Sequence, residues 1–215
     1  GDQGCCGLPA LSAGDTQTFG RLVRHHLARW QTQPWDYLVT ACATCTATIR
    51  TIWPLFLPEA TAAEKDAIRR LAEKTLDISQ FLVDILGISE QTAPPPGGGF
   101  TVTYHDPCHL KKTLGVSAQP RSLLQATPGL QLREMVEADW CCGCGGGFNL
   151  QQYEISKAIG HRKVDHILAA GAAVVATGCP ACMLQCLDLL SQRGAPVQVR
   201  HTVELYAAHL ADGRD

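Results

Sequence analysis

The stretch "AAVVATGCPAC", residues 172–182, joins a short apolar run directly to a C-x-x-C pair. The apolar run is typical of a buried strand, and the residues that follow the pair have the periodicity of a helix. The same order occurs earlier in the chain, where "DYLVTACATC" at 36–45 leads into "TATIRTIW". A buried strand that leads straight into a helix indicates an α/β fold with a largely parallel sheet.

A CCG triplet precedes each C-x-x-C pair at a nearly constant distance. The first triplet occupies residues 5–7, and 35 residues separate its second cysteine from the pair at 42–45. The second triplet occupies residues 141–143, and 36 residues separate its second cysteine from the pair at 179–182. Because the two spacings agree within one residue, the sequence indicates an internal duplication. We therefore expect two duplicated Rossmann-like domains, each built around one CCG triplet.

The residues between each triplet and its C-x-x-C pair have a helical pattern. Asp15 is the expected N-cap of the first of these helices, and Gly171 is the expected C-terminal stop of the second. The apolar positions are Phe19, Leu22, Val23, His26, Leu27 and Trp30 in the first copy, and Ile155, Ala158, Ile159, Val164, Ile167 and Leu168 in the second.

A linker is predicted between the two copies. Residues 61–87 have a helical pattern, and the stretch "APPPGGG" at 93–99 cannot form regular structure. The predicted domains are therefore 1–92 and 100–215, joined by the linker at 93–99.

Two strands of the second copy have no counterpart in the first. The second copy opens with a predicted strand at 100–106, and a further strand is predicted at 130–135, just before the CCG triplet. We expect the first domain to lack its N-terminal strands here, with their counterparts lying upstream of Gly1.

The composition excludes several classes of protein. The chain has 215 residues, 46% of them hydrophobic, and a formal net charge of −2. No run of basic residues occurs, which argues against nucleic acid as a partner. No apolar window reaches the roughly 18 residues that a membrane-spanning helix needs. We expect a cytoplasmic protein, with any association with the inner membrane made through partners.

Eleven cysteines are a large number for this length. An odd count, adjacent cysteines and C-x-x-C spacing fit a disulfide framework poorly. A chain of this size also has a core large enough to fold without disulfides. The cysteines therefore indicate bound metal or an iron–sulfur cluster in a reducing compartment.

The cysteines of the second copy follow its predicted strands. They are Cys108, Cys141, Cys142, Cys179 and Cys182. Because the carboxyl ends of parallel strands meet at one edge of a sheet, we expect these five thiols to converge. Five thiolates exceed the four ligands of a tetrahedral zinc or of an ordinary cubane cluster, and they would suit irons in an opened cluster. Gly143 and the glycines at 145–147 would let backbone N–H groups reach the sulfurs.

Other candidates near this edge have a structural interpretation beside a chemical one. We interpret His105 and His109 as structural residues at the strand end and in the cluster shell, with metal ligation as the alternative. Asp106 is the expected N-cap of the helix that begins at "PCHLKK". Cys186 is interpreted as a core thiol, and Cys144 as an extra thiol close to the site.

These motifs resemble the cysteine-rich CCG domain family. The pattern C-x32-CC-x36-C-x-x-C and the stretches "YHDPCHLKKTLG", "CCGCGGGFNL" and "VVATGCPACM" carry the resemblance. The family includes the B-type subunit of heterodisulfide reductase, the iron–sulfur subunits of glycolate oxidase and lactate dehydrogenase, and lactate-utilisation proteins. The lactate and glycolate group is the most similar.

The resemblance implies two CCG domains, and a [4Fe-4S] cluster of cubane or non-cubane type in the second. In the first copy it implies a metal site made of Cys5, Cys6, Cys42 and Cys45. This site has no upstream cysteine, and four thiolates suit zinc as well as an iron–sulfur cluster.

The expected function is that of an iron–sulfur electron-transfer subunit of a lactate- or glycolate-type dehydrogenase. Electrons would come from a flavoprotein partner that carries FAD, and would pass to a quinone or another carrier. A ferredoxin-type or quinone-linked membrane subunit is a further expected partner. The alternatives are a heterodisulfide or thiol reductase whose cluster is the catalytic site, and a zinc-bound scaffold without redox activity.

Overall fold

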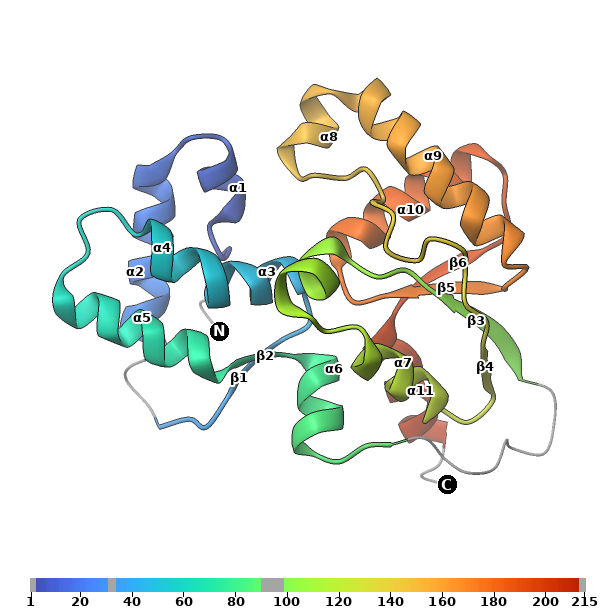
Figure 1. Ribbon diagram of the computed structural model, residues 1–215, viewed down its shortest axis with the longest axis horizontal. Coiled ribbons are helices and arrows are strands. Elements are labelled where there is room, and N and C mark those ends of the chain that lie inside the picture. Colours follow the sequence, from blue (N-terminus) through green and yellow to red (C-terminus); the bar gives the residue numbers. More distant parts are fainter. Residues whose placement is uncertain (1–2, 31–33, 90–98, 213–215) are drawn as a thin grey trace. The chain divides into compact units, whose positions relative to one another are not determined.

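The computed structural model describes residues 3–30, 34–89 and 99–212 (Figure 1). The chain divides into two compact units, Gly1–Asp77 and Ile78–Asp215, which we call unit 1 and unit 2. All but Gly99 of the linker predicted at 93–99 lies outside the described residues. The domain boundaries drawn from that linker remain predictions.

Unit 1 contains a small parallel sheet and a helical layer. Its elements are α1 (Leu8–Ser12), α2 (Thr16–Trp30), β1 (Leu38–Thr40), α3 (Ala43–Ala47), the π-helical segment η1 (Thr48–Ile52), α4 (Trp53–Phe56), α5 (Ala62–Lys74) and β2 (Thr75–Asp77). Strands β1 and β2 pair in parallel, with Leu38 opposite Thr75. The strand predicted at 36–41 is therefore present, and it leads into the C-x-x-C pair as expected.

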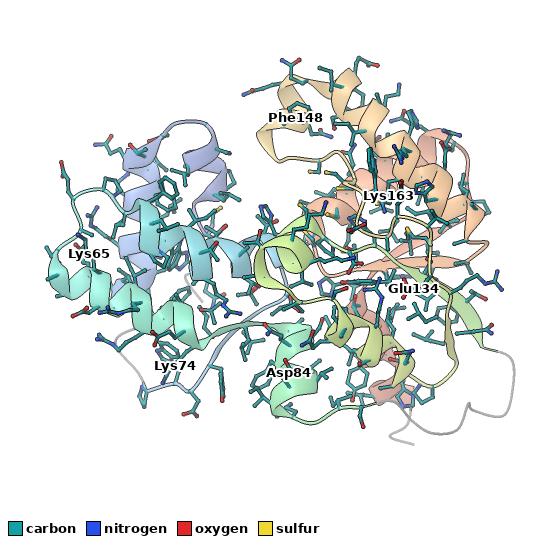
Figure 2. The ribbon with its side chains drawn as sticks, in the orientation of Figure 1. Lys65, Lys74, Asp84, Glu134, Phe148 and Lys163 are labelled. Atoms are coloured by element: carbon teal, nitrogen blue, oxygen red, sulfur yellow. The ribbon has the colours of Figure 1, made fainter. Side chains whose placement is uncertain are left out.

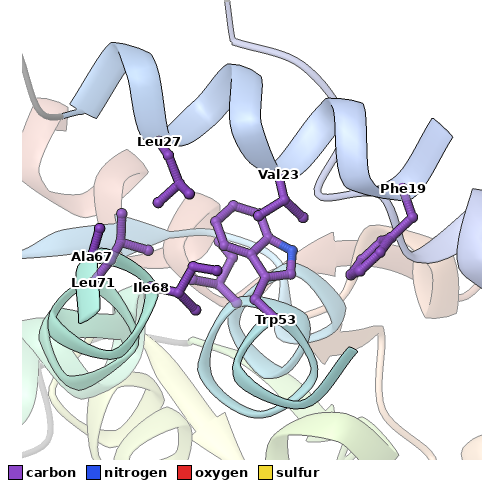
Figure 3. Close-up of a cluster of buried hydrophobic side chains, with 8 residues drawn as sticks. Phe19, Val23, Leu27, Trp53, Ala67, Ile68 and Leu71 are labelled. Atoms are coloured by element: carbon purple, nitrogen blue, oxygen red, sulfur yellow. The ribbon is translucent and has the colours of Figure 1, made fainter. Parts of the chain in front are cut away.

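The core of unit 1 confirms the predicted apolar face of α2. Figure 3 shows Val23 and Leu27 of this helix facing Trp53, with Leu71 of α5 in the same cluster. The carboxylate of Asp15 accepts a hydrogen bond from the Thr18 N–H at 2.8 Å, as an N-cap does.

The helix predicted over 61–87 is wrong in its second half. Helix α5 begins with a capping box between Thr61 and Glu64 and ends at Lys74. The next three residues form β2, because Thr75 and Asp77 are buried where they pair with β1. The chain then returns to helix in α6 (Ile78–Gln80) and η2 (Phe81–Ile85). A strand of three residues leaves the helical periodicity on both sides almost unchanged, so tertiary pairing overrides the local pattern.

Unit 2 is a parallel sheet with helices on both faces (Figure 1). After α6 and η2 its elements are β3 (Phe100–Tyr104), η3 (His109–Thr113), α7 (Ala118–Gln125), β4 (Leu130–Leu132), α8 (Gly147–Gln151), α9 (Tyr153–Ala169), β5 (Val174–Thr177), α10 (Pro180–Gln192), β6 (Gln198–His201) and α11 (Thr202–Asp212). The strand order is β4-β3-β5-β6, and every pair is parallel. The α/β class and the parallel sheets predicted from the sequence are confirmed.

The buried face of α9 differs from the predicted one. Ile155 is 54% exposed, whereas Ser156, Gly160 and Lys163 are buried together with Val164. Small residues are needed on this face because a Cβ at Gly160 would lie 2.7 Å from the Cys142 carbonyl oxygen. The close packing of α9 on the CCG loop therefore selects small side chains at 156 and 160, each one residue after a predicted apolar position.

Candidate metal centre

The fold of unit 2 brings the predicted cysteines to one edge of the sheet. Strands β3 and β5 are neighbours, so Cys108 after β3 and Cys179 after β5 leave the sheet at the same edge. Cys179 is the N-cap residue of α10, and Cys182 lies in the first turn of that helix. The partial positive charge of a helix N-terminus favours thiolates at this position.

The CCG loop has a conformation that requires glycine. Gly143 has φ +93°, and a Cβ at this position would collide with the backbone carbonyl oxygen of Ser156. The Gly143 N–H donates to Cys141 Sγ at 3.3 Å, which confirms the expected contact between a loop N–H and a sulfur. The Ser156 hydroxyl donates to the Gly143 carbonyl at 2.8 Å and fixes the loop to α9.

Cys142 is the centre of the thiol cluster. Hydrogen bonds from the thiols of Cys141 and Cys182 hold the pKa of Cys142 well below its usual range. The same bonds raise the pKa of Cys141, and they raise the pKa of Cys182. Burial raises the pKa of Cys108, and the charge of Cys142 raises it further. The lowered pKa favours the thiolate form of Cys142, and the thiols around it can each lose a proton to a metal.

His105 also faces this cluster. One of its ring nitrogens and the Sγ atoms of Cys142 and Cys182 all lie within 4.8 Å of one another. The side chain is 1% exposed, and it interacts with Cys142, although neither ring nitrogen has a partner at ordinary hydrogen-bond geometry. His105 therefore packs against the thiol cluster, which is one of the two structural roles expected for the histidines that flank Cys108.

The donor set of unit 2 fits an iron–sulfur group or another thiophilic metal centre. Thiolates are the ligands that such centres prefer, and the lowered pKa of Cys142 favours its thiolate form. The buried nitrogens of His105 lack a partner at ordinary hydrogen-bond geometry, and a bound group beside them would supply one. The fit thus depends on the chemistry of the donors and on their grouping at one buried point.

Asp106 does not have the N-cap role predicted for it. Its carboxylate pairs with Arg121 at 2.9 Å and accepts a hydrogen bond from the Ser117 hydroxyl at 2.9 Å. Burial alone would raise the pKa of Asp106, but the Arg121 guanidinium outweighs it and lowers the pKa. Lys111 forms a second ion pair with the same carboxylate, at 3.5 Å, so two cations hold Asp106 at the end of β3.

Lys163 is a buried cation beside the CCG loop that sequence analysis missed. Its Nζ donates to the carbonyl oxygens of Glu137 at 2.6 Å and Ala138 at 3.1 Å, in the turn that leads to the triplet. Burial lowers the pKa of Lys163 to about 8, although the charges of Cys186, Asp139 and other acidic groups raise it in part. Figure 2 labels Lys163 on α9. A lysine within an amphipathic helix is normally exposed, so no pattern in the sequence indicated this role.

The four predicted cysteines of unit 1 repeat the CCG-loop geometry of unit 2 and add a hydrogen bond within the C-x-x-C pair. Gly7 has φ +91°, and its N–H donates to Cys5 Sγ at 3.5 Å. The Cys45 N–H donates to Cys42 Sγ at 3.5 Å. A hydrogen bond from the Cys45 thiol lowers the pKa of Cys6 to about 6. Unit 1 therefore also has one buried thiolate with thiol neighbours.

Three aromatic side chains of unit 1 line the same cavity as its thiols. His26 stacks on Trp30 with ring centroids 4.7 Å apart, and Trp53 lies 5.9 Å from Trp30. The Trp53 indole N–H donates to the Cys6 carbonyl at 2.9 Å. These rings and the thiols of Cys6, Cys42 and Cys45 line a cavity of about 260 Å³.

The two extra cysteines of unit 2 differ from each other. Cys186 is fully buried on α10 and burial raises its pKa, which agrees with its interpretation as a core thiol. Cys144 is half-buried and lines a cavity of about 430 Å³ together with Leu150 and Leu184.

None of the eleven cysteines forms a disulfide. Among the described residues, the helices are too short or too polar to span a bilayer.

Comparison with known proteins identifies the class. The model of the cysteine-rich domain family (CCG) matches residues 1–50 and 102–186, which is more than half of the chain. The chain therefore belongs to this family, with one matched region in each copy of the repeat.

The relatives differ in how much of their length the chain covers. The chain is 32% identical over 208 residues to lactate utilization protein A of Geobacillus kaustophilus, which covers 96% of this chain and 83% of that protein. It is 34% identical over 204 residues to a subunit of the fumarate reductase (CoM/CoB) of Methanothermobacter marburgensis, which covers 94% of this chain but 38% of that protein. It is 33% identical to an uncharacterized iron-sulfur protein of Methanococcus maripaludis, of which it spans 35%.

Proposed function

We propose that the chain is the iron–sulfur electron-transfer subunit of a flavin-linked 2-hydroxy acid dehydrogenase acting on lactate or glycolate. The observation that carries the proposal is the convergence of cysteine side chains around Cys142 at the sheet edge of unit 2. The lactate utilization proteins, which the chain matches over most of their length, support the substrate class.

In this proposal the two units hold separate metal centres. Unit 2 binds a [4Fe-4S] cluster, cubane or non-cubane, through Cys108, Cys141, Cys142, Cys179 and Cys182. Unit 1 binds an iron–sulfur cluster or zinc through Cys5, Cys6, Cys42 and Cys45. A bound iron–sulfur cluster accepts and releases single electrons. The chain contributes the thiolates, the loop N–H of Gly143 to sulfur, and the buried charge of Lys163.

The proposed partners follow from the chemistry of hydroxy acid oxidation. Oxidation of a hydroxy acid needs a hydride acceptor, which we assign to FAD on a flavoprotein partner. Electrons then pass through the unit 2 centre to a quinone or another carrier, with a ferredoxin-type or membrane-associated subunit as the next partner. The proposed location is the cytoplasm, with contact to the inner membrane through those partners.

A thiol or heterodisulfide reductase is the second candidate. The cavity of about 430 Å³ beside Cys144 favours it, because such a cavity has room for a small substrate next to a thiol. The relative named as part of a fumarate reductase (CoM/CoB) agrees with a reductase role. Turnover of a small disulfide by the isolated chain with a reductant would favour this candidate over electron transfer between subunits.

Metal and sulfide analysis of anaerobically purified protein tests the proposal. We expect about four irons and four acid-labile sulfides in unit 2. Visible and EPR spectra should change on reduction. Cys142→Ser and Cys179→Ser should remove this iron, while Cys186→Ala, on the same helix as Cys182, should retain it. Zinc without sulfide or colour in fresh anaerobic protein would contradict electron transfer and leave a zinc-bound scaffold.

A further inference from the structure

His105 is a buried imidazole that faces sulfur. Its side chain is 1% exposed, and it interacts with the side chain of Cys142, although neither ring nitrogen has a partner at ordinary hydrogen-bond geometry. Buried polar groups nearly always find partners, because an unpaired one costs about 1–3 kcal/mol. The buried His26 shows the usual outcome, since its Nε2 lies 3.1 Å from the Cys5 carbonyl oxygen. His105 faces cysteine sulfur instead of an oxygen acceptor, as a ligand that shares a metal with cysteines does.

The sulfur atoms nearest to His105 are spaced as ligands of one metal are. One ring nitrogen and the Sγ atoms of Cys142 and Cys182 lie within 4.8 Å of one another. Nitrogen and sulfur donors around one tetrahedral metal lie about 3.5–3.8 Å apart, so a small inward movement would complete the arrangement. Among the residues that the structure describes, this is the group of His, Cys, Asp or Glu side chains that satisfies such spacing.

Thr177 is placed to orient the imidazole. Tyr104 on β3 lies opposite Ala176 on β5, and the His105 N–H continues the ladder to the Ala176 carbonyl at 2.9 Å. His105 and Thr177 are therefore the next pair across the two strands and share a face of the sheet. The buried hydroxyl of Thr177 also lacks a partner. A ligating histidine normally donates its other N–H to an oxygen acceptor, and we assign that role to this hydroxyl because it lies on the same face of the neighbouring strand.

We propose that His105 is a nitrogen ligand of the metal centre in unit 2, with Thr177 as its positioning residue. The inference rests on the metal centre of the proposed function and adds an imidazole to its thiolates. A centre with several metal ions takes more than four protein donors, so the imidazole is compatible with the five cysteines. Replacement of thiolate by imidazole raises the reduction potential of an iron–sulfur centre, as in Rieske centres.

Zinc binding to the metal-free protein is the first test. The full-length chain carries Cys6→Ser to remove the buried thiol of unit 1, and Zn²⁺ affinity is measured anaerobically against a chelator. We expect His105→Asn to weaken Zn²⁺ binding more than about tenfold. His105→Cys should retain it, because a thiolate can replace the ligand. His209→Asn, on α11, is the matched control and should change nothing. Equal affinity in His105→Asn and the parent would overturn the proposal.

The reconstituted iron–sulfur protein gives a second, independent reading. With ¹⁵N-labelled histidine, pulsed EPR of the paramagnetic centre should show strong coupling from a bound nitrogen, and His105→Asn should lose it. His105→Cys should keep its iron and have a lower reduction potential. A centre with full iron but no such coupling would overturn ligation by His105 and leave the proposed function standing. Failure of Cys142→Ser to release iron would instead overturn the centre itself.

The role of Thr177 is tested through a rescue. Thr177→Val should weaken Zn²⁺ binding by about tenfold, the size found for residues that orient a metal ligand. Thr177→Ser should restore it, because it keeps the hydroxyl. Thr103→Val is the matched control, since Thr103 lies two positions before His105 on the same face and its hydroxyl is also buried and unpartnered. Equal effects of the two valine variants would show a packing role only.

Discussion

The two units share one arrangement of cysteines and differ in what surrounds it. Gly7 and Gly143 have nearly the same φ, +91° and +93°, and each donates its N–H to the first sulfur of its triplet. Cys42 and Cys179 are N-caps with similar extended backbones. The short sequence motifs therefore fix the positions of the thiols, whereas the helix after each triplet determines their environment.

That environment can be compared position by position. His26 in unit 1 and Lys163 in unit 2 both lie sixteen residues before the first cysteine of their C-x-x-C pair. Both are buried, and both contact backbone carbonyl oxygens, His26 within its triplet and Lys163 before its own. Phe19 corresponds in the same way to Ser156. Unit 1 thus places aromatic rings against its CCG loop, and unit 2 places a cation and a hydroxyl at the equivalent positions.

The sheets differ as well. Strand β5 is paired on both sides, by β3 and β6, whereas β1 pairs with β2 in the described part of unit 1. Strand β3 leads to His105 and Cys108, for which the described residues of unit 1 have no counterpart. We therefore expect the two units to bind metal with different affinity and different spectra, even though their CCG triplets have the same conformation.

The largest expected effect comes from adding a methyl group to each triplet glycine. In Gly143→Ala the new Cβ meets the backbone oxygen of Ser156, which cannot move without displacing α9. In Gly7→Ala the Cβ lies 2.7 Å from Cδ2 of Phe19, a side chain that can rotate. In both variants the new alanine also has to adopt a left-handed backbone conformation, which strains a residue with a Cβ. We expect a loss of about 3 kcal/mol for Gly143→Ala and about 1.5 kcal/mol for Gly7→Ala in urea unfolding of the metal-free protein.

Gly14→Ala is the control, because Gly14 also has positive φ but its Cβ meets no neighbouring atom. It isolates the backbone strain, for which we expect about 1 kcal/mol. If Gly7→Ala were as costly as Gly143→Ala, the packing around the two triplets would be equally rigid, and the comparison between the units would fail.

The second prediction concerns Lys163 and His26, the buried basic residues at equivalent positions of the two units. Burial lowers the pKa of Lys163 to about 8 from 10.5, so the unfolded chain binds more protons between these values and stability rises with pH there. Relative to Lys163→Met, the wild-type protein should gain up to about 3 kcal/mol of unfolding free energy across this window. Burial also lowers the pKa of His26, so the corresponding gain over His26→Met should end near pH 6.5.

Unfolding curves of the metal-free protein at several pH values measure both effects, and each is read as a difference from its own methionine variant. That difference removes the contribution of the cysteines, which titrate in the same range. An alkaline gain in the His26 pair, or a flat profile in the Lys163 pair, would show that these residues are not the buried bases of the two units.

Whether a feature of the fold or the site could be predicted from the sequence depends on how far apart in the chain the interacting residues lie. The strand before each C-x-x-C pair and the convergence of strand ends are consequences of short motifs and of parallel topology, so they were predictable. Strand β2 was not, because its pairing with β1 spans 37 residues of sequence and leaves no local pattern. Lys163 was missed, and the choice between the two interpretations of His105 stayed open, for a similar reason. Their burial and their partners are set by packing across the fold, and neither residue differs locally from an exposed lysine or a strand-end histidine.

The smallest expected effect is spectroscopic and concerns the thiolates themselves. In metal-free protein the hydrogen bond from Cys45 lowers the pKa of Cys6 to about 6, whereas the pKa of Cys142 is lowered further by Cys141 and Cys182. On acidification, ultraviolet thiolate absorbance should therefore fall by one thiolate with a midpoint near pH 6. Cys6→Ser should remove this step.

The same pKa predicts a change in stability with a defined sign. Because the folded-state pKa of Cys6 is depressed from 9.0, its stabilising contribution is complete above pH 9 and is lost as the pH falls through about 6. Cys142→Ser should keep the step near pH 6 and lose the thiolate that persists below it. If both variants retained the same acid profile, the two buried cysteines would not be the thiolates of their units, and the symmetry between the triplets would be limited to the backbone.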